Sequence, residues 1–388
     1  MDISSTVLAK QTHRPPGRAS RRHCEHQHKQ CRVVAGRANY PRVFGLALGC
    51  LFLLLLLSLK NLPLLVLDMP SLTMTGTDTE PPPVTLLIWW LPFGNKYPMP
   101  DCASNYGIRG CTVTADRDAY AQADAVIIHN RELMSTWHEL PEQPRPSRQK
   151  WIWMNFESPS HSGWLEEYDG VFNLTMSYRR GSDIFLPYGY LQPRHRNDPH
   201  ETQHAGKLRF GRKRRLVAWI ISNWNENQER VQFYRQLSRY LRVDIYGRSG
   251  WQLFNDSVIQ TVAQYKFYLA FENSVHTDYI TEKLWRNALL AGAVPVVLGP
   301  PRENYERFLP ADAFIHVNDF RSPRRLAAYL KHLDRNPSLY SRYLAWRRDY
   351  TVHVTSFWTE HYCTACRAVQ ASQHQTKTVT HLALWYQA

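Results

Sequence analysis

Runs of apolar residues, spaced along the chain between polar segments, predict an alternation of buried strands and helices. In the N-terminal half, continuous apolar runs of strand length occur at "VTLLIWW" (84–90), "DAVIIHN" (124–130) and "KWIWMNF" (150–156). In the C-terminal half, "NENQERVQFYRQLSRYL" (225–241) places its apolar residues at helical spacing, and a strand-like run precedes it. Continuously apolar strands that alternate with helices are typical of parallel sheets covered on both faces. We therefore predict an α/β fold.

The chain divides at residues 191–215, a segment rich in proline and charged residues that we interpret as a domain linker. We predict an N-terminal domain at 83–205, a second domain at 206–345, and a C-terminal segment with a C-x-x-C pattern at 346–388. In the second domain, the strand-like run "FYLAFEN" (267–273) leads through a polar loop into the helical pattern "TEKLWRNALLAG". Strand–loop–helix units of this kind build doubly wound sheets.

An uncharged and nearly all-apolar stretch, residues 43–59, follows a basic N-terminal tail, and apolar character resumes at 62–67. About 17–25 residues of this kind span a bilayer as a helix. The flank before the stretch is rich in arginine, so the positive-inside rule leaves the N-terminus in the cytosol and sends the rest across the membrane. We predict a cytosolic tail (1–42), a retained transmembrane signal anchor (43–67) and a stem (68–82), with a cleaved signal peptide as the alternative.

The formal charge of +14 invites a nucleic-acid interpretation. Half of that excess lies in residues 1–42, which hold nine Lys and Arg residues against two acidic ones. Most of the rest lies in the cluster "RFGRKRR" (209–215). Because the excess is concentrated in a tail and a linker, we predict no nucleic-acid partner.

The cysteines beyond the anchor form two pairs in sequence: Cys102 with Cys111, and Cys363 with Cys366. An even number of cysteines in an oxidising compartment favours disulfides, and pairing of sequence neighbours would close a small loop and staple the C-terminus. A zinc site is the alternative, although no histidine lies at ligand spacing. Two sequons, which begin at Asn173 and Asn255, are consistent with glycosylation in the lumen.

The loop and helix start in "FENSVHTDYITEKLWRNALLAG" (271–292) carry the strongest chemical signal. We expect Thr281 to be the N-cap of the helix, which puts Glu282 and Lys283 in its first turn. Free N–H groups and the positive helix end favour an anion there, whereas a lysine is unfavourable unless an anion lies close. We interpret Lys283 as a diphosphate ligand and Glu282 as an acceptor for a sugar hydroxyl. The alternative is a solvated first turn with a capping acid.

Two further residues lie where a parallel sheet would place ligand contacts. Arg230 is near the start of the helix that follows a strand, and is a second candidate anion ligand unless it is an ordinary surface residue. In "WIWMNFESPSH" (151–161), a strand runs into Glu157 before Ser-Pro breaks it. A carboxylate among aromatic side chains becomes a stronger base, so Glu157 is a candidate general base, with a turn cap as the alternative.

The motif "DRD" (116–118) matches the Asp-x-Asp pattern of metal-using sugar-nucleotide enzymes. It lies between the first cysteine pair and the apolar run at 124–130, in a context typical of a turn or a helix start. We therefore predict no metal site.

Taken together, these segments resemble the α1,3-fucosyltransferases of glycosyltransferase family 10. "FYLAFENSVHTDYITEKLWRNALLAGAVPVVLGP" resembles the donor-site signature of that family over its whole length. "WMNFESPSH", "SYRRGSDIFLPYGY" and "VAWIISNWNENQERVQFY" match further family segments in the expected order, and the resemblance covers roughly residues 84–388. A further C-x-x-C that some relatives carry before "TVAQY" is absent, because the segment here reads "GRSGWQLFNDSV".

The resemblance implies a GT-B fold, in which two Rossmann-like domains face a cleft. The first domain would meet the acceptor and the second would bind GDP-fucose. It also implies that both cysteine pairs are disulfide-bonded. The roles that it implies are a general base for Glu157, pyrophosphate binding for Arg230 and Lys283, ribose binding for Glu282, and donor contacts for Asn273 and Tyr279.

The implied reaction is inverting transfer of L-fucose from GDP-β-L-fucose to the 3-OH of GlcNAc in N-acetyllactosamine, which makes Lewis x or sialyl Lewis x. No cofactor is required, and stimulation by a divalent cation is left open. The implied partners are glycoprotein and glycolipid acceptors and the Golgi membrane, with the catalytic domain of a single-pass type II protein in the lumen. A fucosyltransferase of another linkage and a lumenal glycan-binding protein without catalysis are the alternatives. Acceptor sialylation and oligomeric state stay open.

Overall fold

The computed structural model describes these residues of the chain: 82–94, 96–135, 140–194, 213–248 and 250–388. All of them belong to one unit of the chain, residues 63–388. The predicted cytosolic tail, signal anchor and almost all of the predicted stem lie outside the described residues. Within the described part, no helix combines the length and the apolar character needed to cross a membrane.

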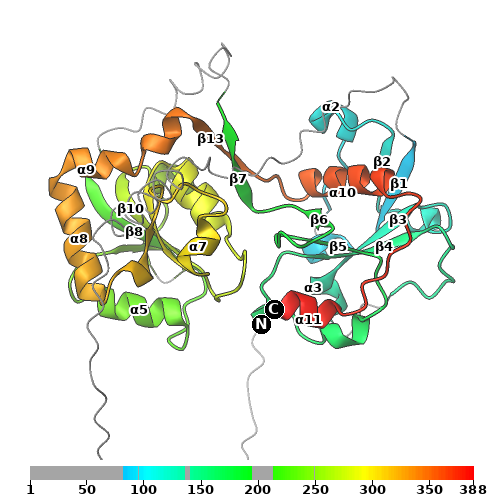
Figure 1. Ribbon diagram of the computed structural model, residues 1–388, viewed down its shortest axis with the longest axis horizontal. Helices are drawn as coiled ribbons and strands as arrows, with labels where there is room; N and C mark the ends of the chain where they lie inside the picture. The colour runs from blue at the N-terminus through cyan, green and yellow to red at the C-terminus, as the bar shows by residue number, and fades with distance from the viewer. Residues whose placement is uncertain (1–81, 95, 136–139, 195–212, 249) are drawn as a thin grey trace, which may run out of the picture. The chain divides into compact units, whose positions relative to one another are not determined.

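The first domain is built on a six-stranded sheet with the strand order β2-β1-β3-β4-β5-β6 (Figure 1). All of its strand pairs are parallel. Every residue of β3 and β4 is buried, which explains why both strands are continuous apolar runs in the sequence. The elements are β1 (Val84–Ile88), α2 (Cys102–Tyr106), β2 (Cys111–Thr114), β3 (Ala125–His129), α3 (Asn130–Leu133), β4 (Lys150–Asn155), β5 (Leu174–Ser177) and β6 (Ile184–Phe185).

The second domain contains a five-stranded parallel sheet with the order β12-β11-β10-β8-β9. Its central strand β10 alternates between two apolar clusters, so that Phe267 and Leu269 lie in one and Tyr268 and Ala270 in the other. Two parallel sheets confirm the predicted α/β class. The elements are β8 (Arg215–Ile220), α5 (Glu229–Leu237), β9 (Asp244–Tyr246), α6 (Val258–Val262), β10 (Tyr265–Phe271), the π-helix η6 (Lys283–Leu290), β11 (Val294–Leu298), α7 (Arg302–Tyr305), β12 (Ile315–His316), α8 (Pro323–Arg335) and α9 (Pro337–Arg342).

The C-terminal segment returns to the first domain. Strand β13 (Tyr350–Val354) pairs antiparallel with β7 (Gly189–Pro193). Helices α10 (Thr359–Ala371) and α11 (Leu382–Gln387) then bury apolar side chains in the same core as β1, β3 and β4. In Figure 1, α10 lies along the side of the sheet that carries β1 and β2. The first domain is therefore assembled from two separate stretches of the chain.

The disulfides link those two stretches, and the predicted pairing of sequence neighbours is wrong. Cys102 bonds to Cys363 and Cys111 bonds to Cys366, with Cα–Cα distances of 5.3 and 6.1 Å. The physical reason is the geometry of α10, where residues three apart share one face of a helix. That face packs against α2 and β2, which carry the two partner cysteines.

Candidate active site

Lys283 is the first residue of η6, at the carboxyl end of the second sheet. Its Nζ lies 2.9 Å from Oε2 of Glu272, 3.2 Å from Oε1 of Glu282 and 2.7 Å from Oγ1 of Thr281. Burial by itself would lower the pKa of Lys283, but the two carboxylates outweigh it and hold the pKa above its ordinary value. The side chain is only 16% exposed, so it is a buried and permanently charged ammonium group and not part of a solvated turn.

The predicted role of Thr281 as the N-cap of this helix is wrong. Its hydroxyl donates to both carboxylate oxygens of Glu272, at 3.0 and 2.8 Å, and its backbone N–H donates to Oε1 at 2.9 Å. Glu282 holds the cap position without a side-chain cap bond. The reason is that the buried carboxylate of Glu272 needs donors and takes those of Thr281. The predicted helix does form, but as a π-helix, a geometry that occurs frequently at functional sites.

Arg230 is the second residue of α5 and is only 5% exposed, which excludes an ordinary surface arginine. Its guanidinium donates to Oε1 of Gln228 at 2.9 Å and to the carbonyl oxygen of Asn223 at 2.7 Å. Burial lowers the pKa of Arg230, while the charges of Glu272 and Glu282 oppose that shift. Arg230 therefore lies within the field of the same two carboxylates that contact Lys283.

Asn273 and Tyr279 lie on the loop that connects β10 to η6. Asn273 is half-buried, and its Oδ1 accepts a hydrogen bond from Oγ of Ser274 at 3.2 Å. Oγ of Ser274 lies 2.7 Å from Oγ of Ser158, which directly follows Glu157 in the sequence. The loop therefore contacts the segment that carries the candidate base.

Glu157 follows the end of β4 and is half-buried. Its backbone N–H donates to Oδ1 of Asn155 at 3.1 Å, and its carbonyl oxygen accepts from the hydroxyl of Tyr386 on α11. Burial raises the pKa values of Tyr188 and Tyr279, and the negative charge of Glu157 raises both further.

The same two tyrosines also respond to the charges at the start of η6. Glu272 and Glu282 raise the pKa values of both, and Lys283 lowers that of Tyr279. Tyr279 is 3% exposed. Tyr279 is therefore a buried residue that senses the charges of both Glu157 and Lys283.

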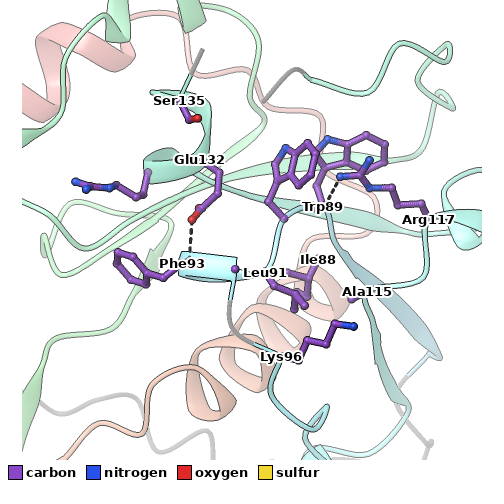
Figure 2. Close-up of a pocket in the computed structure, with 12 residues that line it drawn as sticks. Ile88, Trp89, Leu91, Phe93, Lys96, Ala115, Arg117, Glu132 and Ser135 are labelled. Atoms are coloured by element: carbon purple, nitrogen blue, oxygen red, sulfur yellow. Dashed lines mark hydrogen bonds between the residues drawn. The ribbon is translucent and has the colours of Figure 1, made fainter. Parts of the chain in front are cut away.

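A cavity of about 560 Å³ opens at the carboxyl end of the first sheet (Figure 2). Arg117 lies over the rings of Trp89 and Trp90, 4.2 and 3.9 Å from their centroids. Glu132 accepts from the backbone N–H of Phe93 at 2.8 Å and lies 2.5 Å from Nδ1 of His129. Burial would raise the pKa of Glu132, but these two partners lower it. The pocket thus combines aromatic faces with charged groups, which suits a sugar ligand.

The "DRD" turn contributes Arg117 to this cavity. Oδ1 of Asp116 accepts from the backbone N–H of Asp118 at 3.1 Å, as in a helix-capping turn. Among the described residues, no group of three or more His, Cys, Asp or Glu side chains is arranged to hold a metal ion.

Comparison with known proteins finds two family models that match this chain. The fucosyltransferase N-terminal family matches residues 81–189, and the family described as glycosyltransferase family 10 (fucosyltransferase), C-terminal part, matches residues 210–385. The chain belongs to glycosyltransferase family 10. The fucosyltransferase resemblance in the sequence is thereby confirmed.

Two relatives illustrate how close the family members are. Bovine alpha-(1,3)-fucosyltransferase 4 is 49% identical over 351 residues, which cover 80% of this chain and 88% of the relative. Human 4-galactosyl-N-acetylglucosaminide 3-alpha-L-fucosyltransferase FUT6 is 50% identical over 316 residues, which cover 80% and 85%. A crystal structure of an alpha1,3-fucosyltransferase with GDP-fucose aligns with a TM-score of 0.52 at 17% identity, over 77% of this chain and 93% of that one. It supports the GT-B-like fold.

The sequence analysis did not identify Glu272 and Asp278 as residues of the candidate site. Glu272 is 2% exposed at the end of a buried strand, and an acidic residue at that place was an available signal. Asp278 has a left-handed φ of 62°, and its carboxylate accepts from the backbone N–H of Arg180 at 3.0 Å and from Nδ2 of Asn304 at 2.6 Å. These contacts fix the backbone immediately before Tyr279, and no local sequence pattern predicts them.

The two sequon asparagines lie in different surroundings. Asn173 is half-buried, with Oδ1 accepting from the backbone N–H of Trp151 and Nδ2 donating to the carbonyl of Lys377, both at 2.8 Å. Asn255 is exposed, and its Nδ2 donates to Oε1 of Gln260 at 3.0 Å. Glycosylation at either position stays a prediction.

Proposed function

We propose that this chain is an inverting α1,3-fucosyltransferase that moves L-fucose from GDP-β-L-fucose to the 3-OH of GlcNAc in N-acetyllactosamine. The observation that carries the proposal is the contact of Lys283 with the carboxylates of Glu272 and Glu282, with the buried Arg230 in the field of the same carboxylates. The loop that leads to Lys283 also contacts the segment that carries Glu157, through Ser274 and Ser158. Family membership at about half identity, reported above, supports the reaction class.

The buried cations suit a diphosphate leaving group. As the bond between fucose and GDP breaks, negative charge grows on the pyrophosphate, and fixed cations in a site shielded from water stabilise that charge. Lys283 is held in place by three oxygen atoms and Arg230 by two, so little reorganisation is needed when the donor arrives. Glu282, which is 38% exposed, would accept a hydrogen bond from the ribose, and Asn273 and Tyr279 would contact the donor.

Glu157 would act on the acceptor. It would remove the proton of the GlcNAc 3-OH as that oxygen attacks the anomeric carbon from the face opposite GDP, which inverts the configuration. Its backbone is fixed on both sides, at the N–H by Asn155 and at the carbonyl by Tyr386. The aromatic cavity at the carboxyl end of the first sheet would receive the lactosamine.

We place the protein in the Golgi membrane as a single-pass type II protein with its catalytic part in the lumen. The two disulfides in the described part support an oxidising compartment. Glycoproteins and glycolipids carrying lactosamine are the proposed acceptors, and the products are Lewis x or sialyl Lewis x.

The deciding experiment assays the full chain with GDP-fucose and a panel of neutral and sialylated lactosamines. Glu157→Gln should abolish transfer while GDP still binds, and Lys283→Ala should weaken both GDP affinity and turnover. Glu167→Gln is the matched control, because Glu167 is an exposed carboxylate of the same domain. Linkage analysis of the product separates α1,3 transfer from other linkages. Wild-type turnover in Glu157→Gln, or glycan binding without any GDP affinity, would overturn the proposal.

A further inference from the structure

The carboxylate of Glu272 has an unusual position for a group with no assigned role. It lies at the carboxyl end of the central strand β10, and its side chain is 1% exposed. A buried carboxylate is unfavourable unless charged and hydrogen-bonding partners surround it. Glu272 has both, because it accepts from the N–H and hydroxyl of Thr281 and pairs with the ammonium group of Lys283.

These contacts close the loop that carries the donor-side residues. The backbone N–H of Glu272 donates to the carbonyl of Leu298 at 2.8 Å, which fixes the loop's start to β11. Its side chain then contacts Thr281 and Lys283 at the end of the loop, nine and eleven residues further along the chain. A side chain placed at Gly299 would come 3.3 Å from Cγ of Glu272 and 2.4 Å from the hydroxyl of Tyr305. Glu272 therefore packs closely against the backbone of Gly299, and its carboxylate is held by hydrogen bonds to Thr281 and its ion pair with Lys283.

Thr281 links the carboxylate to the lysine. Its hydroxyl accepts from Nζ of Lys283 at 2.7 Å and donates to Glu272, so the three groups form a closed triangle. A lysine has four rotatable side-chain bonds and is otherwise free to move its charge. The triangle removes that freedom before any ligand is bound.

The negative charge of Glu272 raises the pKa values of both Lys283 and Arg230. Glu272 is the leading charged partner of Lys283, ahead of Glu282, and it is also the leading charged partner of Arg230. Glu282 is partly exposed and therefore more strongly screened by solvent than Glu272. Glu272 is thus the buried carboxylate that pairs with Lys283, and Arg230 lies in its field.

We propose that Glu272 is a positioning residue for fucosyl transfer: by direct contact and through Thr281 it holds the ammonium group of Lys283 where charge grows on the departing diphosphate. The proposal rests on the proposed function, because it assigns Lys283 to the donor. It differs from a loop-bracing role, which would lower donor affinity and turnover together. A positioning residue acts mainly on turnover, since only the transition state needs the lysine in one place.

The test is a double-mutant cycle in the full chain. Glu272→Gln keeps the shape and an acceptor for Thr281 but removes the charge. We expect kcat to fall about 10- to 100-fold, with the Kd for GDP weakened less than about threefold. Lys283→Ala is expected to lower kcat about 100- to 1,000-fold, and adding Glu272→Gln to it should change kcat less than about twofold. Asp319→Asn, which breaks a partly exposed ion pair with Arg302, is the control and should leave kcat unchanged.

Two results would overturn the positioning role. One is a double mutant whose loss of kcat equals the product of the two single-mutant losses; the other is an equal loss of GDP affinity and turnover in Glu272→Gln. If Glu272→Gln does not fold, Thr281→Val and Thr281→Ser give the answer, because only valine lacks the hydroxyl between Glu272 and Lys283. We expect a fivefold or larger loss of kcat in Thr281→Val alone, and equal rates would reject the proposal. If Glu157→Gln and Lys283→Ala kept full activity, the proposed function would fail instead.

Discussion

His361 is a buried imidazole that the folded protein keeps uncharged. It is fully buried on α10, with its ring 4.3 Å from that of Phe156 and 4.2 Å from that of Phe357. Nδ1 lies 3.4 Å from the carbonyl oxygen of Ser356, and Nε2 has no hydrogen-bond partner among the described residues. Burial lowers the pKa of His361 from 6.5 to about 3, against a smaller opposing effect of the hydrogen bond to the carbonyl of Ser356. Protonation of His361 is therefore coupled to unfolding.

The size of the effect follows from the two pKa values. Below pH 6.5 the unfolded chain takes up a proton that the folded chain refuses, so stability falls as the pH falls toward 3. Between pH 7 and pH 5 this group alone lowers the free energy of unfolding by about 2 kcal/mol. For a domain of this size, that corresponds to about 4–8 °C in Tm. His361→Phe keeps the aromatic packing and removes the titrating group.

Thermal unfolding at pH 7, 6 and 5 and constant ionic strength measures the effect. We expect the wild type to lose about 4–8 °C more than His361→Phe over this range. His332→Gln, which changes an exposed histidine of the second domain, should follow the wild type. Parallel Tm curves for the wild type and His361→Phe would refute the reasoning.

Three further predictions concern other contacts. Tyr386→Phe removes the hydroxyl that donates to the carbonyl of Glu157, so kcat should fall about 3- to 10-fold with an unchanged KM for GDP-fucose. The free energy of unfolding should fall by only about 1 kcal/mol. Initial-rate kinetics measure the effect, and an unchanged kcat would contradict the prediction. The disulfides should be non-additive. While Cys111–Cys366 remains, loss of Cys102–Cys363 frees only a short loop of the unfolded chain and lowers the free energy of unfolding by about 3 kcal/mol. Loss of both disulfides frees more than 250 residues and lowers it by about 8 kcal/mol in all. Denaturant unfolding of serine variants measures both values. In the proposed reaction Arg230 and Lys283 stabilise the charge of the leaving group, so EDTA should leave the initial rate within about twofold. A rate that fell more than tenfold and recovered with Mg²⁺ would contradict this.

The sequence was sufficient for the parts of the structure that depend on local patterns. Continuous apolar runs predicted the buried strands β3 and β4, and the helical spacing at 225–241 predicted α5. The positions of Arg230 and Lys283 at helix starts also followed from strand–helix alternation. In each case the residues that decide the outcome are neighbours in the chain.

The errors concern contacts between distant residues. The cysteine partners are set by the packing of α10 on α2 and β2, more than 250 residues away in the chain. Thr281 fits the sequence pattern of an N-cap, but its hydroxyl donates to the buried carboxylate of Glu272. Helix-capping preferences do not predict such a contact. The left-handed backbone of Asp278 is accompanied by hydrogen bonds to Arg180 and Asn304, both distant in the sequence.

The return of α10 to the first sheet has a consequence for biosynthesis. At about 5–20 residues per second, a ribosome needs roughly 13–50 s to proceed from Cys102 to Cys363, 261 positions later. Until α10 and α11 are made, apolar side chains of the first sheet stay uncovered and the thiols of Cys102 and Cys111 lack their partners, whereas all strands of the second sheet are made before α10. Folding in the cell should therefore finish in the reverse of chain order, with chaperones and thiol oxidoreductases protecting the early half until the last helices emerge.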